Sequence, residues 1–206
     1  MTDIPQYATF AKIEPLNKGW SSDKKYYIET HAGERLLLRI ADIAERERKL
    51  AEFEMLKRVA ELDVPASRPI DFGECSGGKS VYQLLTWIDG EDSQTVLPTL
   101  SEAEQYALGV KAGEILRKMQ TLQTTPMNSE WLNAYGAKID RYIENYKNCG
   151  LTFWGDDTVI AYLEENRHLL DNRAMCFTHD DYHLGNLILS PENKLFVIDF
   201  QRFRMV

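Results

Sequence analysis

Two acids and one amide near the C-terminal end of the chain constrain its fold more than any other feature. Asp181 precedes Asn186 by five positions, and Asp199 follows after two apolar runs. The turn-forming segment 191–194 separates those runs, which is typical of a β-hairpin. A hairpin brings Asn186 and Asp199 together although they are thirteen positions apart in sequence. The pattern therefore predicts a loop and a strand end that present all three side chains to one site.

The first third of the chain favours strands around a single helix. Asp42 with Glu45 is typical of a helix N-terminus, and Val64-Pro65 ends that helix after about Leu62. Apolar and β-branched runs predict five strands, the first three as an antiparallel meander, at residues 7–13, 25–30, 35–40, 68–72 and 80–87.

The second part of the chain favours helices. Ser101 and Glu104 form a capping-box pattern ahead of a long periodic segment. Helices are predicted at residues 101–122, 137–148 and 156–170, and strands at 174–178, 187–190 and 195–199. We therefore expect an α+β fold of two lobes. Residues 1–88 would form an antiparallel sheet with one helix, and residues 89–206 a mainly helical lobe that carries the late hairpin.

Composition excludes several classes of protein. The formal net charge is −8 and no basic stripe is present, so nucleic acid is not an expected partner. The cysteines Cys75, Cys149 and Cys176 are scattered and form no zinc-ligand cluster, which favours a reduced, cytoplasmic protein. No window approaches the roughly 18 apolar residues of a membrane span, and the N-terminus has neither the basic start nor the apolar run of a leader.

The chemistry of the late motif suits phosphoryl transfer. In that reaction one carboxylate accepts the proton of the attacking hydroxyl or orients it, which is the role we expect for Asp181. An amide oxygen and a second carboxylate hold the metal on the phosphates, which would fall to Asn186 and Asp199. Catalysis of this kind consists mostly of positioning and charge neutralisation.

Two other interpretations of the motif stay open at the level of sequence. His179, Asp180 and Asp181 could simply cap a turn. Alternatively, His179, Asp180 and His183 could belong to a divalent-metal phosphohydrolase. That second interpretation needs further His ligands upstream, where the sequence offers only two more histidines.

These residues also carry a family resemblance. The order His179-x-Asp181-x-x-x-x-Asn186, followed by an apolar strand that ends in Asp199, resembles the catalytic and metal loops of protein kinases. The segment 185–189, Gly-Asn-Leu-Ile-Leu, is more similar to the aminoglycoside phosphotransferase and choline-kinase-like families. The resemblance implies a protein-kinase-like two-lobe fold, with Mg²⁺ as cofactor and ATP or GTP as phosphate donor.

The same resemblance extends to the nucleotide side of the site. Residues 35–40 resemble the third strand of the kinase-like fold, with Arg39 where most members carry the phosphate-binding Lys. Arg keeps its charge when buried and can pair with phosphate. Its expected ionic partner is Glu52, which shares a helix face with Met55, Leu56 and Val59 and therefore needs a counter-charge.

Two further segments complete the expected nucleotide site. The loop 19–23 would lie over the phosphates, with Ser21 and Ser22 offering hydroxyl and backbone N–H groups. Residues 84–90 resemble the linker between lobes, where backbone groups of Thr86 and Ile88 would hydrogen-bond the purine edge.

The chain departs from the family pattern at three places. Asp180 replaces the Gly of antibiotic kinases, which should raise the pKa of one of two adjacent carboxyls unless Asp180 points to solvent. Gln120 falls where related enzymes tend to have His. Members of the family also continue through further helices beyond the position of Val206, so we expect an incomplete second lobe. A fragment, a partner chain that fills the gap, or a truncated kinase would each explain this, and exposed apolar surface would favour self-association.

The expected function is transfer of a nucleotide γ-phosphate to a hydroxyl of a small polar molecule, most simply an aminoglycoside-type antibiotic. The acidic balance would suit a cationic acceptor. Two alternatives remain: a kinase for a small metabolite such as choline, homoserine or a sugar-like compound, and an inactive nucleotide-binding fragment. No membrane or nucleic acid is expected among the partners.

Overall fold

The structure, a computed structural model, describes residues 1–17, 22–122, 128–171, 176–200 and 204–205. The chain divides into two compact units. The first contains Met1–Leu122 and Thr178–Arg204, and the second contains Gln123–Phe177 with the last two residues. The predicted boundary at residue 88 falls inside the first unit, and a division of the chain there stays a prediction.

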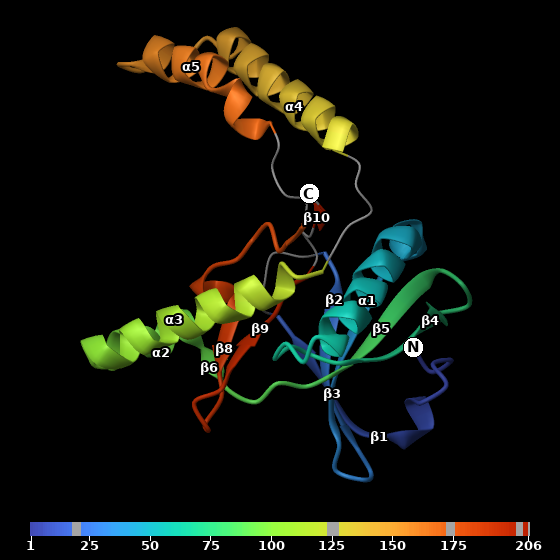
Figure 1. The fold of residues 1–206 in the computed structure, drawn as a ribbon. Coiled ribbons are helices and arrows are strands. Elements are labelled where there is room, and N and C mark those ends of the chain that lie inside the picture. The colour runs from blue at the N-terminus through green and yellow to red at the C-terminus, as the bar shows by residue number, and fades with distance from the viewer. Residues whose placement is uncertain (18–21, 123–127, 172–175, 201–203, 206) are drawn as a thin grey trace. The chain divides into compact units, whose positions relative to one another are not determined.

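A five-stranded antiparallel sheet forms the first part of the first unit (Figure 1). The strand order is β1-β2-β3-β5-β4, so the predicted three-stranded meander is confirmed. The first strand begins later than predicted, because residues 7–9 form a 3₁₀ turn, η1. The strands span Phe10–Leu16 (β1), Lys24–Thr30 (β2), Arg35–Asp42 (β3), Pro69–Cys75 (β4) and Ser80–Thr86 (β5).

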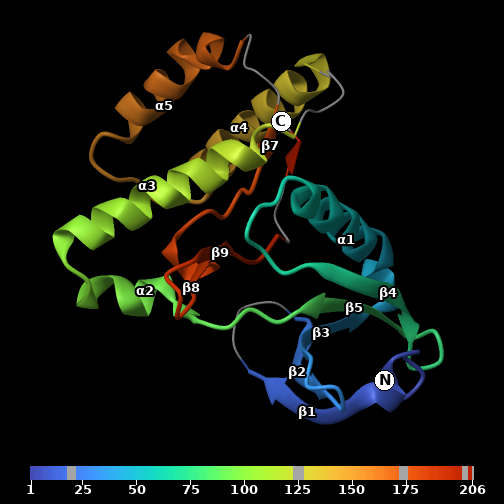
Figure 2. The ribbon, with the colours of Figure 1, turned by 60° about the horizontal axis from the view of Figure 1, so that its bottom comes forward.

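The two faces of this sheet differ in chemistry because side chains alternate along each strand. On one face Leu36, Leu38 and Ile40 of β3 are buried in an apolar cluster with Ile28 and Leu84. Arg39 points to the other face, against which helix α1 (Arg46–Glu61) packs after the 3₁₀ turn η2 (Ile43–Glu45) (Figure 2). The layer between the sheet and α1 therefore contains charged side chains together with buried apolar ones such as Phe53 and Val59 of the helix.

The connection out of the sheet requires glycine at one position. Gly90 has φ +148°, and a Cβ there would lie 2.4 Å from the carbonyl oxygen of Leu189. This close approach lets β6 (Glu91–Asp92) pair with β8 (Leu187–Leu189). The short helical elements α2 (Ser93–Val96) and η3 (Leu97–Thr99) follow, and the sequence did not predict them.

The rest of the first unit contains helix α3 and the late hairpin. Helix α3 (Glu102–Met119) begins at the predicted capping box of Ser101 and Glu104. The hairpin itself is confirmed as β8 and β9 (Leu195–Val197), preceded by the 3₁₀ turn η5 (Leu184–Asn186). Two-residue strands also occur at Phe177–Thr178 (β7) and Arg204–Met205 (β10).

A short backbone clasp ties β9 to the segment that follows α1. The amide of Val197 donates to the carbonyl of Pro65 at 2.9 Å, and Ala66 forms an isolated parallel bridge with Val197. The strand that leads to Asp199 is thus fixed against the end of the helix that packs on the sheet.

The second unit is a helical hairpin of α4 (Asn128–Asn148) and α5 (Asp156–Glu165), followed by η4 (Arg167–Leu170). The Tyr146 hydroxyl donates to Asp156 at 2.7 Å and joins the two helices. The predicted helix 156–170 is interrupted at Asn166, whose side chain donates to the Tyr162 carbonyl. Among the helices in the described part of the chain, none combines the length and apolar content needed to cross a bilayer.

Candidate active site

The loop between β7 and η5 holds Asp181 through a tight backbone turn. The Asp181 amide donates to the His179 carbonyl at 2.8 Å, and the intervening Asp180 has φ +55°. Backbone conformations of this kind are uncommon for residues other than glycine and concentrate at functional sites. Asp180 itself is exposed, and its carboxylate accepts a hydrogen bond from the Thr178 hydroxyl at 2.8 Å. The turn therefore directs Asp180 to solvent and leaves Asp181 half-buried.

The buried side chain of His179 supports this loop. Its side chain is 1 % exposed and packs against the rings of Tyr182 and Phe200. Burial lowers the pKa of His179, so the ring is neutral near pH 7. Nε2 lies 3.0 Å from the Ile198 carbonyl, which can only accept, so Nε2 carries the proton. His179 thereby links the loop to the strand end before Asp199.

Asn186 is oriented so that its side-chain oxygen remains available. Its side-chain Nδ2 donates to the main-chain carbonyl of Asp181 at 2.9 Å, and the main-chain carbonyl of Asn186 accepts from the Ile198 amide at 3.0 Å. These bonds bring Asn186 beside Asp181 and beside the residue that precedes Asp199. The structure thus places the three predicted residues around one loop and one strand end.

The Asp199 carboxylate is suited to bind a cation. Its Oδ1 is shielded from solvent and accepts no hydrogen bond from any residue that the structure describes. A buried carboxylate oxygen without a donor is unfavourable unless another group satisfies it. Together with the side-chain oxygen of Asn186 it offers the hard oxygen ligands that Mg²⁺ prefers. Asp199 also has φ +65°, a second strained backbone position in this site.

His183 is a further residue of the site, which the sequence had offered only as a ligand of a phosphohydrolase. Its Nδ1 accepts from the Gly185 amide at 3.0 Å, so the ring proton lies on Nε2. Nε2 is 3.5 Å from Asp181 Oδ1. With Asp180 turned to solvent and His179 bound to a carbonyl, these residues do not converge on a metal. Indeed, no group of three or more His, Cys, Asp or Glu side chains within the described ranges could hold one.

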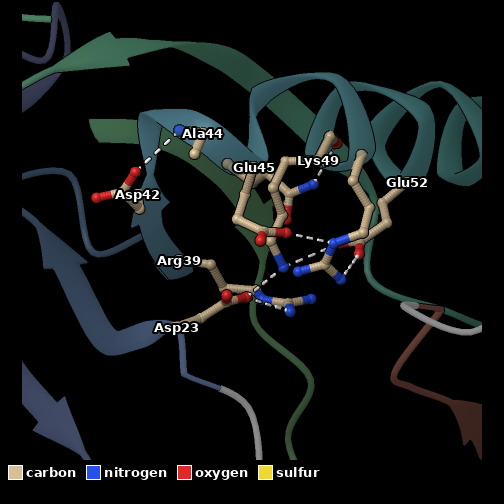
Figure 3. A network of polar contacts seen from close by, with 9 residues as sticks. Asp23, Arg39, Asp42, Ala44, Glu45, Lys49 and Glu52 are labelled. Carbon is tan, nitrogen blue, oxygen red and sulfur yellow. Dashed lines mark hydrogen bonds and ion pairs between the residues drawn. The ribbon is translucent and has the colours of Figure 1, made fainter. Parts of the chain in front are cut away.

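A buried cluster of charges lies between β3 and α1 (Figure 3). Arg39 Nη2 and Lys49 Nζ both donate to Asp23 Oδ2, each at 2.6 Å. Lys49 Nζ also lies 3.4 Å from Glu52 Oε2, and Arg48 Nη1 lies 3.1 Å from Glu52 Oε1. We call Asp23, Arg39, Arg48, Lys49 and Glu52 the charge cluster; Arg48 is exposed and lies at its edge.

The expected direct pair between Arg39 and Glu52 is therefore not the arrangement found in these described residues. Lys49 lies three positions before Glu52 on α1, and its ammonium occupies the space beside the Glu52 carboxylate. Arg39 instead pairs with Asp23, the residue directly before β2. The sequence analysis missed Lys49 and Asp23, although the i,i+3 spacing of Lys49 and Glu52 on the buried side of the helix was a readable signal.

The two carboxylates of the charge cluster respond differently to their surroundings. Burial disfavours ionisation of Asp23, but Arg39 and Lys49 outweigh it and hold the pKa of Asp23 below its usual value. For Glu52, burial prevails and raises the pKa, although Lys49, Arg39 and Arg48 oppose the shift. Glu52 is 2 % exposed.

The remaining predicted nucleotide contacts are only partly described. Ser22 is exposed, and Ser21 lies outside the described residues. The amide of Thr86 donates to the Arg68 carbonyl at 2.9 Å, which leaves its carbonyl as the backbone group that could meet a purine. The Thr86 carbonyl and the backbone of Ile88, whose side chain is buried, keep their predicted role as a proposal.

Solved structures similar to this one share its protein-kinase-like fold. They include a protein assigned as a fructosamine-3-kinase from Haemophilus somnus 129PT, at 15% identity and TM-score 0.63, with 94% of this chain and 67% of that one covered. Aminoglycoside phosphotransferase APH(4)-Ia, solved with ADP and hygromycin B, gives 15% identity, TM-score 0.63 and coverage of 96% and 69%. Amicoumacin kinase hAmiN, solved with AMP-PNP and Ca²⁺, gives 14% identity, TM-score 0.58 and coverage of 97% and 64%.

The chain spans about two thirds of the length of these proteins. These likenesses confirm the predicted two-lobe kinase-like fold. A search of curated protein sequences gives no match. The sequence model of the phosphotransferase enzyme family, however, matches residues 12–205, nearly the whole chain. The chain therefore belongs to the phosphotransferase enzyme family.

Proposed function

We propose that this protein transfers the γ-phosphate of ATP or GTP to a hydroxyl of a small polar molecule. The observation that supports this most directly is the shielded Oδ1 of Asp199, which lies in the same site as Asn186 and Asp181 and accepts no bond from the described residues. A shielded carboxylate oxygen without a hydrogen-bond donor is suited to bind a divalent cation on a phosphate chain.

Each residue of the loop has a separate task in this proposal. Asn186 and Asp199 would hold Mg²⁺, which neutralises charge on the transferred phosphates when it is bound. Asp181 would accept a hydrogen bond from the acceptor hydroxyl and orient it for attack. The Nε2–H of His183, 3.5 Å from Asp181 Oδ1, would help to fix that carboxylate. On the nucleotide side, the Arg39 charge, Ser21 and Ser22 would face the phosphates.

The comparisons support the choice of donor and acceptor. One neighbour holds AMP-PNP with Ca²⁺, and another holds ADP with the aminoglycoside hygromycin B. An aminoglycoside-type acceptor would be cationic, and the net charge of −8 would favour its approach. A sugar-like acceptor is the second candidate, because the neighbour assigned as a fructosamine-3-kinase has the same TM-score as the hygromycin-bound one.

The proposal can be tested with a matched pair of acidic variants. Purified protein would be assayed for ADP or GDP release with gentamicin, hygromycin B and a fructosamine as acceptors. Asp181→Asn should lower turnover by about 10²- to 10⁴-fold, the usual contribution of a catalytic proton acceptor, and leave nucleotide affinity unchanged. Asp180→Asn, whose carboxylate faces solvent, should keep turnover near that of the wild type.

Equal turnover of Asp181→Asn and the wild type would remove Asp181 from the mechanism. Nucleotide binding without turnover on any acceptor would support the inactive-fragment alternative instead.

A further inference from the structure

Gly185 is the central residue of the turn η5, and the proposed function does not use it. The backbone at this position does not require glycine, because Gly185 is not among the described glycines with positive φ. A residue with a Cβ could adopt the same dihedral angles. The reason for glycine must therefore lie in what surrounds the residue.

The ring of His183 occupies the space that a side chain at position 185 would need. A Cβ at Gly185 would lie 2.9 Å from Cε1 and 3.2 Å from Nδ1 of His183, and 3.4 Å from Oε1 of Gln94. Carbon atoms in contact normally stay about 3.5–4.0 Å apart, so the first of these distances is a clash. The Gly185 amide also donates to His183 Nδ1 at 3.0 Å. The missing Cβ leaves room for the ring, and the amide fixes its orientation.

This arrangement decides which ring nitrogen faces Asp181. Because Nδ1 accepts from the Gly185 amide, the proton lies on Nε2, which is 3.5 Å from Asp181 Oδ1. A displaced ring would lose the bond to Gly185 and could then rotate or carry its proton on Nδ1. The Asp181 carboxylate would lose a fixed N–H beside it, although Asp181 itself would be unchanged.

A clash at position 185 should move the His183 ring rather than the backbone. The His183 side chain is 57 % exposed, so it can turn into solvent with little effect on stability. The backbone around it is held more firmly. The Asn186 amide donates to the His183 carbonyl at 2.9 Å, and the Asn186 main-chain carbonyl accepts from the Ile198 amide at 3.0 Å. An added methyl group should therefore misplace one ring and leave the fold intact.

We propose that Gly185 is a positioning residue, whose missing side chain keeps the His183 ring in the orientation that fixes Asp181 toward the acceptor hydroxyl. Gly185 acts through His183 and not on the substrate itself. This assignment rests on the proposed function, because it assumes that Asp181 orients the acceptor.

The test compares two exchanges of glycine for alanine. Gly185→Ala adds the clashing methyl group, whereas Gly113→Ala on α3 adds one where no atom of the described residues lies within 4 Å. Turnover with gentamicin, hygromycin B and a fructosamine, and ATP affinity by calorimetry, would be measured for both variants and for His183→Ala. Loss of one hydrogen bond should lower kcat about tenfold in Gly185→Ala and in His183→Ala. ATP affinity should stay within about twofold, and Gly113→Ala should match the wild type.

A double variant isolates the contribution of the ring. Once His183 is replaced by alanine, the methyl group at position 185 no longer meets an imidazole. Adding Gly185→Ala to His183→Ala should therefore change kcat by less than about twofold. A further measurement is independent of turnover. NMR of the imidazole nitrogens of His183 should report a single tautomer in the wild type and an averaged pair in Gly185→Ala.

The outcomes separate the two proposals. If the wild type turns over an acceptor and Gly185→Ala matches Gly113→Ala, the assignment of Gly185 is overturned and the proposed function stands. The assignment is also overturned if Gly185→Ala loses ATP affinity together with turnover, or if its loss adds in full to that of His183→Ala. If the wild type turns over no acceptor, both proposals fail.

The double variant also covers the case in which Gly185→Ala is too unstable to assay. Restored stability in the double variant would support a clash with the ring. An equally unstable double variant would overturn the assignment, because no imidazole is left to clash.

Discussion

The charge cluster and the loop site, which consists of Asp181, Asn186 and Asp199, both contain carboxylates. The surroundings of these carboxylates differ. In the charge cluster the carboxylates of Asp23 and Glu52 are surrounded by Arg39, Arg48 and Lys49. In the loop site the Oδ1 of Asp199 is shielded without a donor among the described residues. The first arrangement pairs each carboxylate with cations of the protein, although Arg39 Nε makes no hydrogen bond to a described residue, and it fastens α1 to the sheet. The second leaves an acid unsatisfied, as expected where a ligand supplies the missing contact.

The largest expected effect comes from neutralising the acid of the loop site. Asp199→Asn keeps the shape of the side chain and tolerates the positive φ of this position. We expect turnover to fall by about 10³-fold or more, because electrostatic stabilisation of the transferred phosphates is lost. The free energy of unfolding should change by less than about 1 kcal/mol, because no described residue donates to the shielded Oδ1. Steady-state kinetics and urea unfolding would measure both.

A large loss of stability in Asp199→Asn would show that the carboxylate has a partner inside the protein. The Asp199 carboxylate would then be paired within the protein, as the carboxylates of the charge cluster are.

The next effect concerns the ammonium at the centre of the charge cluster. Lys49→Met would leave Asp23 and Glu52 buried with fewer counter-charges, and we expect a loss of about 3–5 kcal/mol in the free energy of unfolding. The matched control is Lys57→Met on the same helix, which removes an exposed pair with Glu54 at the same i,i+3 spacing. That change should cost at most about 1 kcal/mol. Equal losses in the two variants would contradict the buried role of Lys49.

A smaller effect should appear in the pH dependence of stability. Burial raises the pKa of Glu52 above its reference value of 4.5, so the folded state binds this proton more tightly than the unfolded chain. The contribution of Glu52 to stability is therefore greatest below pH 4.5 and declines as the pH rises toward the raised pKa. The difference in unfolding free energy between wild type and Glu52→Gln should fall across that window. A difference that stays flat or increases with pH would contradict the raised pKa.

The smallest expected effect lies at the attachment of the loop to α3. The Tyr182 hydroxyl donates to the Ala112 carbonyl at 2.7 Å. Tyr182→Phe removes this bond and keeps the ring against His179, so we expect a loss of about 1 kcal/mol in thermal or urea unfolding. Turnover should remain near the wild-type value. A loss of turnover much larger than the loss of stability would indicate that this bond also positions Asp181.

Local patterns predicted most of the fold. Apolar and β-branched runs in β1, β2 and β3 and the turn before β9 were enough for the meander and the hairpin, because each depends on residues close in sequence. The capping box at Ser101 fixed the start of α3 for the same reason. The short strand β6 was missed, since its pairing depends on the close approach of Gly90 to β8. No local pattern encodes such a contact.

The same distinction applies to the candidate site. The spacing of Asp181, Asn186 and Asp199 predicted that a hairpin would gather them, and the structure does so, although their chemical roles remain predictions. The partner of Arg39 was predicted wrongly because helix periodicity identifies a buried face but not which charges meet there. Asp23 and Lys49 are 26 positions apart, and only the packing of α1 on the sheet joins them.

The clasp between Val197 and the Pro65–Ala66 peptide has a mechanical consequence. It joins the segment that follows the helix bearing Lys49 and Glu52 to a strand position two residues before Asp199. A rotation of that helix large enough to separate Lys49 from Asp23 would either break the Val197–Pro65 hydrogen bond or move the Asp199 carboxylate. The positions of α1 and Asp199 are thus coupled, so a displacement of one is transmitted to the other through a few peptide units.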